Sequence, residues 1–172
     1  MNGFIIFDKP KGWSSQKAVS KIKYLLKAKK AGHSGTLDPA ATGMLIIALG
    51  KATRLLSYLI LEDKSYTAKI QLGVATDTLD QEGEVIQTKE VPELINGADD
   101  IVLQNALDCF RGGYSQTPPM YSALKKEGQP LYKLARSGIS VERKARDIKI
   151  YSLECTNYDK KSIHNIKLLK KI

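Results

Sequence analysis

Cysteine and histidine are both scarce in this sequence of 172 residues. The two cysteines are Cys109 and Cys155, and the two histidines are His33 and His164. They are too few and too widely scattered for a structural zinc site, whose ligands come in closely spaced pairs, so we expect no metal. Two cysteines could pair in an oxidising compartment, but nothing else in the sequence points to secretion.

Long apolar runs are also missing. The run Phe4–Phe7 is followed directly by Asp8, so it is neither a signal peptide nor a membrane span, and we expect a cytoplasmic protein with no membrane partner. A phosphate-binding P-loop is missing too. Gly50-Lys51 has no glycine five residues before it, and Ala52 stands where such a loop needs Ser or Thr. We therefore expect no nucleotide and no other cofactor.

Acidic residues are outnumbered, with 18 Asp and Glu against 27 Lys and Arg, which gives a formal net charge of +9. Such an excess favours a polyanionic partner, because each phosphate that a lysine or arginine neutralises releases condensed counterions. An anionic membrane could attract the same charge, but the sequence has no long amphipathic basic helix. Lysines gather early in the chain, on one face of an expected helix and just after it: Lys17, Lys21, Lys23, Lys27, Lys29 and Lys30.

The apolar pattern mixes strands and helices. Residues 3–7 read as a strand, and Ser14 or Ser15 can cap a following helix that buries Ala18, Val19, Ile22, Leu25 and Leu26. Further strands are expected at 44–49 (buried on both faces), 64–72, 84–88, 139–142 and 146–155, with an irregular stretch over 112–129. Further helices are expected from Ala52 to Leu59, from Asp99 or Asp100 onward with Ile101, Val102, Ala106 and Phe110 on one face, and over 130–136. This pattern indicates an α+β fold with a mixed, largely antiparallel central sheet flanked by helices.

One loop, Gly32–Gly43, is rich in turn-forming residues and lies between two apolar segments. Its glycines permit unusual backbone angles and close approaches, and Pro39 pushes Asp38 towards an extended conformation. The loop should therefore hold Asp38 stiffly, as a nucleophile or a general base requires. By residue type alone, an aspartate before a proline is more often a cap in a surface turn.

This loop, Gly-His-Ser-Gly-Thr-Leu-Asp-Pro-Ala-Ala-Thr-Gly, resembles the signature loop of the TruB family of tRNA pseudouridine synthases. Other motifs of the family follow in its order: Phe7–Ser15, Leu49–Thr53, Asp63–Tyr66, Gln116–Lys125 and Gly128–Gly138. The resemblance runs from about residue 3 to about residue 153, and it implies a pseudouridine-synthase-like fold. It also implies a cofactor-free enzyme that isomerises the T-loop uridine of tRNA, at position 55.

The resemblance assigns a role to several residues. Asp38 matches the catalytic aspartate. Tyr66 matches the tyrosine whose ring packs on the target base, although its spacing alone favours a core tyrosine on a strand. His33 matches the histidine that enters the T loop and helps to hold the base out, and Lys64 is a natural ligand for RNA phosphates.

Other residues are expected to support the site. Lys9 and Pro10 should shape the wall behind the signature loop, and Gly35 and Thr36 should shape the loop itself. Asp80 is a weaker candidate, as an acid that orients a basic partner of Asp38.

The resemblance ends before the last residues. Family members continue into a strand that carries Lys-Gly-Thr-Tyr-Ile-Arg, whose arginine pairs with the catalytic aspartate, whereas this chain ends Ser162–Ile172 without that motif. We therefore expect residues 1–172 to be the N-terminal portion of the catalytic domain, with no C-terminal RNA-binding domain. Asp38 would then lack its cationic partner, and the sheet would lose a strand. Lysines of the tail (Lys167, Lys170 and Lys171) could touch RNA or belong to an unstructured end.

Two functions stay open at this point. One is an active synthase, and the other is a catalytically impaired homologue that binds the T arm of tRNA without turnover. In either case we expect a monomer, although an exposed sheet edge could favour self-association.

Overall fold

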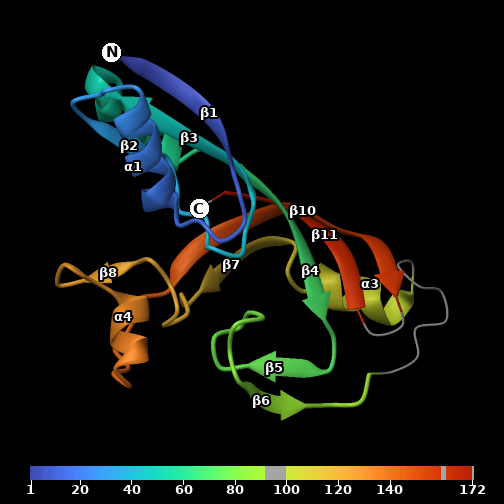
Figure 1. Ribbon diagram of the computed structural model, residues 1–172. Helices are drawn as coiled ribbons and strands as arrows, with labels where there is room; N and C mark the ends of the chain where they lie inside the picture. The colour runs from blue at the N-terminus through green and yellow to red at the C-terminus, as the bar shows by residue number, and fades with distance from the viewer. Residues whose placement is uncertain (92–99, 160–161, 172) are drawn as a thin grey trace. The chain divides into compact units, whose positions relative to one another are not determined.

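The computed structural model describes residues 1–91, 100–159 and 162–171, with side chains described at 1–91 and 100–156. The chain divides into two compact units, Met1–Glu62 and Asp63–Ile172, and each is considered by itself. Both units contain helices and strands, and every strand pair in the described ranges is antiparallel (Figure 1). The expected α+β class is therefore confirmed.

The first unit contains a three-stranded sheet in the order β1-β3-β2. Its elements are β1 (Gly3–Lys9), α1 (Ser15–Leu25), β2 (Ala31–His33), β3 (Gly43–Leu49), the 3₁₀ helix η1 (Gly50–Leu55) and α2 (Leu56–Ile60). The predicted helix at 52–59 thus begins as a 3₁₀ turn.

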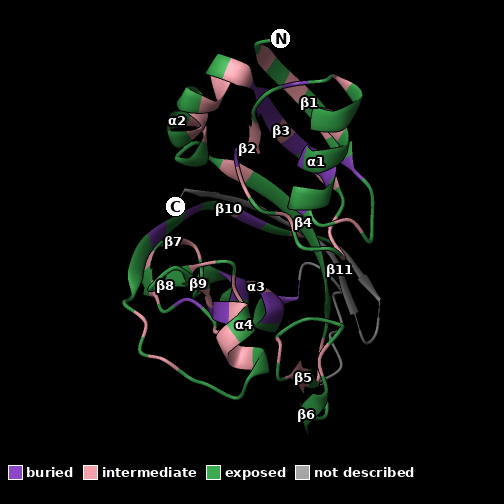
Figure 2. Cartoon of the chain, turned by 60° about the vertical axis from the view of Figure 1, so that its left-hand side comes forward, coloured by how far each residue is buried: buried purple, intermediate pink, exposed green. Residues whose placement is uncertain are grey.

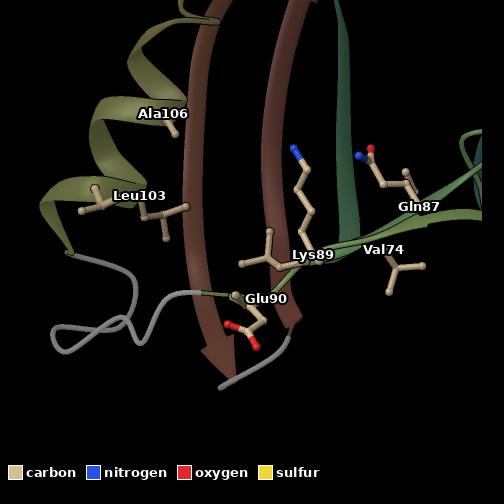
Figure 3. A pocket seen from close by; sticks show the side chains of 11 residues that line it. Val74, Gln87, Lys89, Glu90, Leu103 and Ala106 are labelled. Carbon is tan, nitrogen blue, oxygen red and sulfur yellow. The ribbon is translucent and has the colours of Figure 1, made fainter.

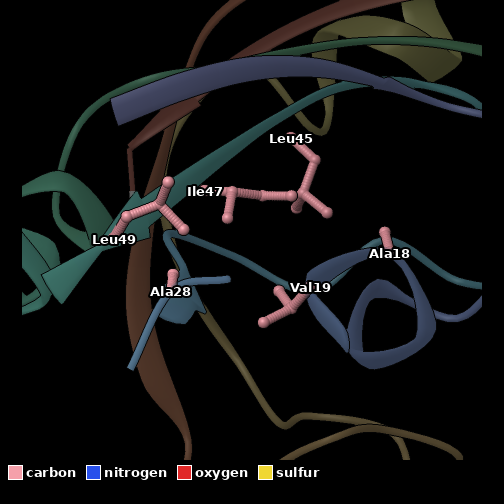
Figure 4. Packing of buried hydrophobic residues seen from close by; sticks show 6 residues of the cluster. All are labelled: Ala18, Val19, Ala28, Leu45, Ile47 and Leu49. Atoms are coloured by element: carbon pink, nitrogen blue, oxygen red, sulfur yellow. The ribbon is translucent and has the colours of Figure 1, made fainter. Parts of the chain in front are cut away.

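Helix α1 begins where the sequence predicts. The Ser14 hydroxyl accepts a hydrogen bond from the backbone nitrogen of Lys17 at 3.1 Å, which satisfies one of the free donors of the first turn. Ala18 and Val19 are buried against the β3 residues Leu45, Ile47 and Leu49 and against Ala28, and together these residues form the core of this unit (Figure 4). Leu25, predicted to share that face, is 58% exposed, so this part of the prediction is wrong.

Strand β3 is buried on both faces only towards its C-terminal end (Figure 2). Leu45 and Ile47 point into the core and Ala48, on the opposite face, is also buried, whereas Met44 on that face is 67% exposed, so the predicted burial of both faces is wrong at the start of the strand. Ile6 of β1, whose partner is Ile46, is 75% exposed on the same side as Met44. An apolar run of this length is compatible with either pattern, because the packing of α1 rather than the run itself decides which side chains are buried.

The second unit has a four-stranded sheet in the order β4-β11-β10-β7 and two small hairpins, β5-β6 and β8-β9. Its strands are β4 (Lys64–Gln71), β5 (Val74–Thr76), β6 (Val85–Thr88), β7 (Gly112–Gln116), β8 (Lys125–Lys126), β9 (Gln129–Pro130), β10 (Arg146–Asp159) and β11 (Ser162–Lys171). Its helices are α3 (Ile101–Asp108) and α4 (Leu131–Arg136).

Strand β11 overturns one expectation. Ile166 pairs with Ala68 of β4 on one side and with Cys155 of β10 on the other, so residues 162–171 form an inner strand of the sheet. They are not an unstructured end, and the expected loss of a strand at this place is wrong. The edges of the four-stranded sheet are β4 and β7.

Helix α3 begins near the predicted residue but buries a different face. The Asp100 carboxylate accepts a hydrogen bond from the backbone nitrogen of Val102 at 2.9 Å and caps the helix. Leu103 and Leu107 are buried against Ile150 and Leu153. The side chains that were predicted to face the core are exposed: Ile101, Val102, Ala106 and Phe110.

Two further expectations fail in this unit. Residues 139–142 form no strand, whereas β7 lies in the 112–129 stretch that was expected to be irregular. Strand β7 pairs with Arg146–Ile150 of β10, so its partner lies about thirty residues away and local pattern could not reveal it. The strand predicted at 84–88 forms as β6 and pairs with β5.

Candidate active site

The loop that carries Asp38 is held to its surroundings at three points. The backbone nitrogen of Ser34 donates to the carbonyl oxygen of Ile46 on β3 at 3.0 Å. The Ser15 hydroxyl bonds the backbone of Leu37, and the backbone nitrogen of Gly12 donates to the carbonyl oxygen of Pro39 at 2.7 Å. Residues on both sides of Asp38 are therefore fastened to the segment that leads into α1.

Asp38 itself combines a fixed backbone with an accessible side chain. Its carbonyl oxygen accepts a hydrogen bond from the backbone nitrogen of Ala41 at 3.0 Å, which closes a turn behind it. Its side chain is exposed, and in the first unit, all of which is described, no hydrogen bond or ion pair engages the carboxylate. A carboxylate so presented is available to a substrate.

Lys9 lies at the end of β1 and is fully buried. Its ammonium donates to the carbonyl oxygens of Trp13 at 2.7 Å and of Pro10 at 3.2 Å. These bonds compensate the burial of the charge and close the turn that holds Gly12 and Ser15 in place. Pro10 is exposed, and its role behind the loop stays a prediction.

His33 ends β2, where it pairs with Ile47 of β3. Its side chain is half-buried, and its Nδ1 atom is buried with no hydrogen-bond partner. Because this Nδ1 atom is closed to solvent, it gives no evidence for a contact with RNA, and the role of His33 in RNA binding stays a prediction.

Gly35 and Thr36 precede Asp38 in the loop. Thr36 is exposed and Gly35 is half-buried. A Cβ atom added to Gly35 would meet nothing within 4 Å, and its backbone is not in the left-handed region. The fold of the first unit therefore does not require glycine at this position, although a close approach of substrate could.

The lysine-rich face of α1 is exposed along its length. All six lysines named above are exposed, and the ammonium of Lys17 lies 5.0 Å from the centroid of the Trp13 ring. The first unit therefore presents several positive charges on the helix that follows the turn at 10–13, where they can contact a polyanion.

Tyr66, Lys64 and Asp80 belong to the second unit. Tyr66 lies on β4 opposite Leu168 of β11, and its side chain is 38% exposed, so it is not buried in a core. Lys64 begins the same strand and is half-buried. The closeness of these residues to Asp38, which belongs to the first unit, stays a prediction.

Asp80 lies in the turn between β5 and β6. Its carboxylate accepts hydrogen bonds from the Thr78 hydroxyl at 2.6 Å and from the backbone nitrogen of Glu82 at 2.9 Å. These bonds give Asp80 a local role in the shape of the turn. A role towards a basic partner of Asp38 remains untested.

Gly12 and Ser15 are the residues that sequence reasoning missed. Ser15 was considered only as an alternative helix cap, whereas Ser14 is the cap and Ser15 contacts the loop. The adjacent pair of serines indicated that one of them has another role, because one helix needs only one N-cap. The partner of the second serine lies 22 residues further along the chain, beyond the reach of local patterns.

A cavity of about 390 Å³ lies in the second unit between the β5–β6 hairpin and α3 (Figure 3). Leu103 and Ala106 face it from the helix, and Val74, Lys89 and Glu90 line it from the hairpin and the segment that follows. No residue predicted for the site lines this cavity. In the described residues, no cluster of three or more histidine, cysteine or acidic side chains could hold a metal ion, and no helix is long and apolar enough to span a membrane.

Comparison with known proteins gives consistent matches. Residues 23–169 match the model of the TruB family pseudouridylate synthase N-terminal domain. The tRNA pseudouridine synthase B of Francisella tularensis subsp. novicida is 52% identical over 160 residues, which cover 92% of this chain and 52% of the relative. That of Coxiella burnetii strain Dugway is 48% identical over 163 residues, covering 95% and 52%. The chain thus spans about half the length of the curated relatives it matches.

Solved structures share the fold. A crystal structure of a Cbf5-Nop10-Gar1 complex contains a chain with a TM-score of 0.65 and 28% identity, covering 98% of this chain and 39% of that chain. A structure of an H/ACA RNP bound to a substrate RNA containing 2′-deoxyuridine gives a TM-score of 0.64 and 25% identity, covering 98% and 38%.

Proposed function

The chain belongs to the TruB family of pseudouridine synthases, and from that premise we propose that it isomerises the T-loop uridine of tRNA, at position 55, to pseudouridine. In this reaction the bond between C1′ of the ribose and N1 of the base breaks, the base turns, and C1′ joins C5. The proton on C5 is lost and N1 gains one, so no redox change occurs. The reaction requires no cofactor.

The proposal rests on the way in which the loop holds Asp38. Its backbone is fixed from both sides by the bonds of Ser15 to Leu37 and of Gly12 to Pro39, while its carboxylate stays exposed. A nucleophile or a general base needs a fixed position and a reactive group that the substrate can reach. We assign the catalytic role to Asp38, whether it attacks the sugar or the base or abstracts a proton.

We propose that RNA binds through both units. The exposed lysines of α1 and the half-buried Lys64 can neutralise phosphates of the T arm. The partly exposed ring of Tyr66 offers a stacking surface for a uridine that has left its helix, and His33 supports the displaced base. We propose that the reaction takes place in the cytoplasm.

The second candidate is a protein that binds the T arm without turnover. It is favoured by the lack of a partner for the Asp38 carboxylate in the first unit, all of which is described. A carboxylate without a cationic partner is less well oriented than one held by an arginine. Both candidates use the same basic surface, so only turnover distinguishes them.

The test is release of tritium from a T-arm stem-loop RNA labelled at C5 of its uridines, because turnover removes the C5 hydrogen. The wild-type chain is compared with Asp38→Asn, which keeps the shape of the side chain and removes its charge. We expect release by the wild type and a loss on the order of 10³-fold in the variant.

RNA binding, measured by fluorescence anisotropy, is the control in this test. It should be similar in both proteins, because Asp38→Asn leaves the basic residues in place. Binding without release by the wild type would establish the second candidate instead. Equal release by both proteins would contradict the role of Asp38.

A further inference from the structure

We propose that Ser15 is a positioning residue for Asp38, which it orients through the backbone of Leu37. This inference rests on the proposed function, because it concerns how the catalytic carboxylate is held. Ser15 is 3% exposed, so its hydroxyl is withdrawn from water and from any substrate, and it acts only through the residue that it bonds.

The hydroxyl of Ser15 forms hydrogen bonds with both backbone polar groups of Leu37. Its Oγ accepts a hydrogen bond from the Leu37 nitrogen at 2.9 Å and donates one to the Leu37 carbonyl oxygen at 3.1 Å. One hydroxyl has one donor and two acceptor sites, so both bonds can exist together. Because the nitrogen and carbonyl of Leu37 flank its Cα atom, the two bonds restrict both of its backbone dihedral angles.

The carbonyl of Leu37 belongs to the peptide plane that includes the nitrogen of Asp38 and ends at its Cα atom. A rotation of that plane therefore turns the Cα–Cβ bond of Asp38 and moves its carboxylate. On the other side of Asp38, the bond between Gly12 and Pro39 would persist without the Ser15 hydroxyl. Loss of the hydroxyl should therefore disorient the carboxylate without releasing the whole loop.

The neighbouring Ser14 provides a matched control. Ser14 caps α1 through the nitrogen of Lys17, whereas Ser15 makes the two bonds to Leu37, so adjacent residues of one type have different tasks. Replacement of Ser14 by alanine should weaken the first turn of α1 and leave the loop unchanged. A change seen only with Ser15 cannot then be a general effect of a weaker α1.

The experiment compares the full chain with its Ser15→Ala and Ser14→Ala variants in two measurements. Amide hydrogen exchange by NMR follows Leu37 in the loop and Ile47 in β3. Steady-state kinetics on the T-arm RNA separates kcat from KM. In Ser15→Ala we expect exchange at Leu37 to rise about tenfold while Ile47 stays protected, because one local hydrogen bond is lost and the core remains.

The kinetic expectation follows from misplacement of the carboxylate. In Ser15→Ala we expect kcat to fall about 10- to 100-fold with KM changed by less than about twofold, because orientation is lost and RNA contacts are kept. Ser14→Ala should show neither change. If Ser15→Ala also loses protection at Ile47, the milder Ser15→Cys is measured in its place.

Three outcomes would overturn the proposal: unchanged exchange at Leu37, unchanged kcat, or the same losses in Ser14→Ala. Failure of the proposed function looks different, since the wild-type chain itself would then show no turnover. In that case the exchange at Leu37 alone decides whether Ser15 orders the loop, and its role in positioning a catalytic group is refuted.

Discussion

The backbone nitrogen of Gly12 lies 2.7 Å from the carbonyl oxygen of Pro39 and donates a hydrogen bond to it. Gly12 can do so because its φ is +80°, a left-handed conformation that residues with a Cβ atom adopt with strain. The turn that precedes α1 and the loop that carries Asp38 are thereby joined, although they are distant in sequence.

Gly12→Ala should destabilise the first unit by about 1–2 kcal/mol, because alanine is strained at this φ even though its Cβ would meet nothing within 4 Å. Gly35→Ala is the control, since neither its backbone nor its surroundings require glycine. Urea denaturation measures both. Equal stability of Gly12→Ala and the wild type would show that the left-handed turn does not form in solution. If Gly35→Ala folds normally but loses activity, the cause is contact with RNA.

Ile47→Ala should cost about 2–5 kcal/mol, because it opens a cavity in the core between β3 and α1. Met44→Ala, three residues earlier on the same strand, should change stability by less than about 0.5 kcal/mol because its side chain is 67% exposed. Thermal denaturation of both variants tests whether Ile47 is buried while Met44 is exposed. Similar losses in the two variants would mean that the Met44 side chain is covered as well.

A chain that ends at residue 159 should lose the sheet of the second unit. It lacks β11, which separates β4 from β10, so two strands lose a hydrogen-bonded neighbour at once. A chain that ends at residue 171 keeps all of β11 and serves as the control. Far-ultraviolet circular dichroism and amide exchange measure the outcome. Full protection of the β10 amides in the shorter chain would contradict the central place of β11.

Tyr66→Ala should weaken binding of the T-arm RNA by about 1–3 kcal/mol, the usual contribution of one base stacked on an aromatic ring. Tyr66→Phe keeps the ring and should bind like the wild type. Tyr58→Ala removes a tyrosine of α2 that is 69% exposed and provides a control for surface aromatic rings in general. Anisotropy titrations at fixed salt measure all three. Equal binding by Tyr66→Ala and the wild type would remove Tyr66 from the site.

What the sequence could predict depended on the distance between interacting residues. The Ser14 cap and the Asp100 cap were predictable, because each is an interaction within one turn of a helix. The exposure of Met44 and Ile101 was not predictable, because apolar spacing does not show which side of a strand or helix packs against the rest of the protein. The pairing of β7 with β10 depends on the fold as a whole.

In the candidate site, too, the residue types could be predicted from sequence but the contacts between distant residues could not. Asp38, in its loop of glycines and proline, was recognisable from sequence. The bonds that hold the loop were not, because Ser15 and Leu37 are 22 residues apart. Strand β11 was not predicted either. Residues 162–171 were judged by the family motif that they do not contain, and not by the strand that they form.

The most direct test of the account is to map pseudouridine in the product. A full-length tRNA transcript is incubated with an excess of the wild-type chain, treated with a carbodiimide that marks pseudouridine, and read by primer extension. The account predicts one new stop, at the T-loop uridine, that Asp38→Asn does not produce. No stop, or a stop at another uridine, would contradict it.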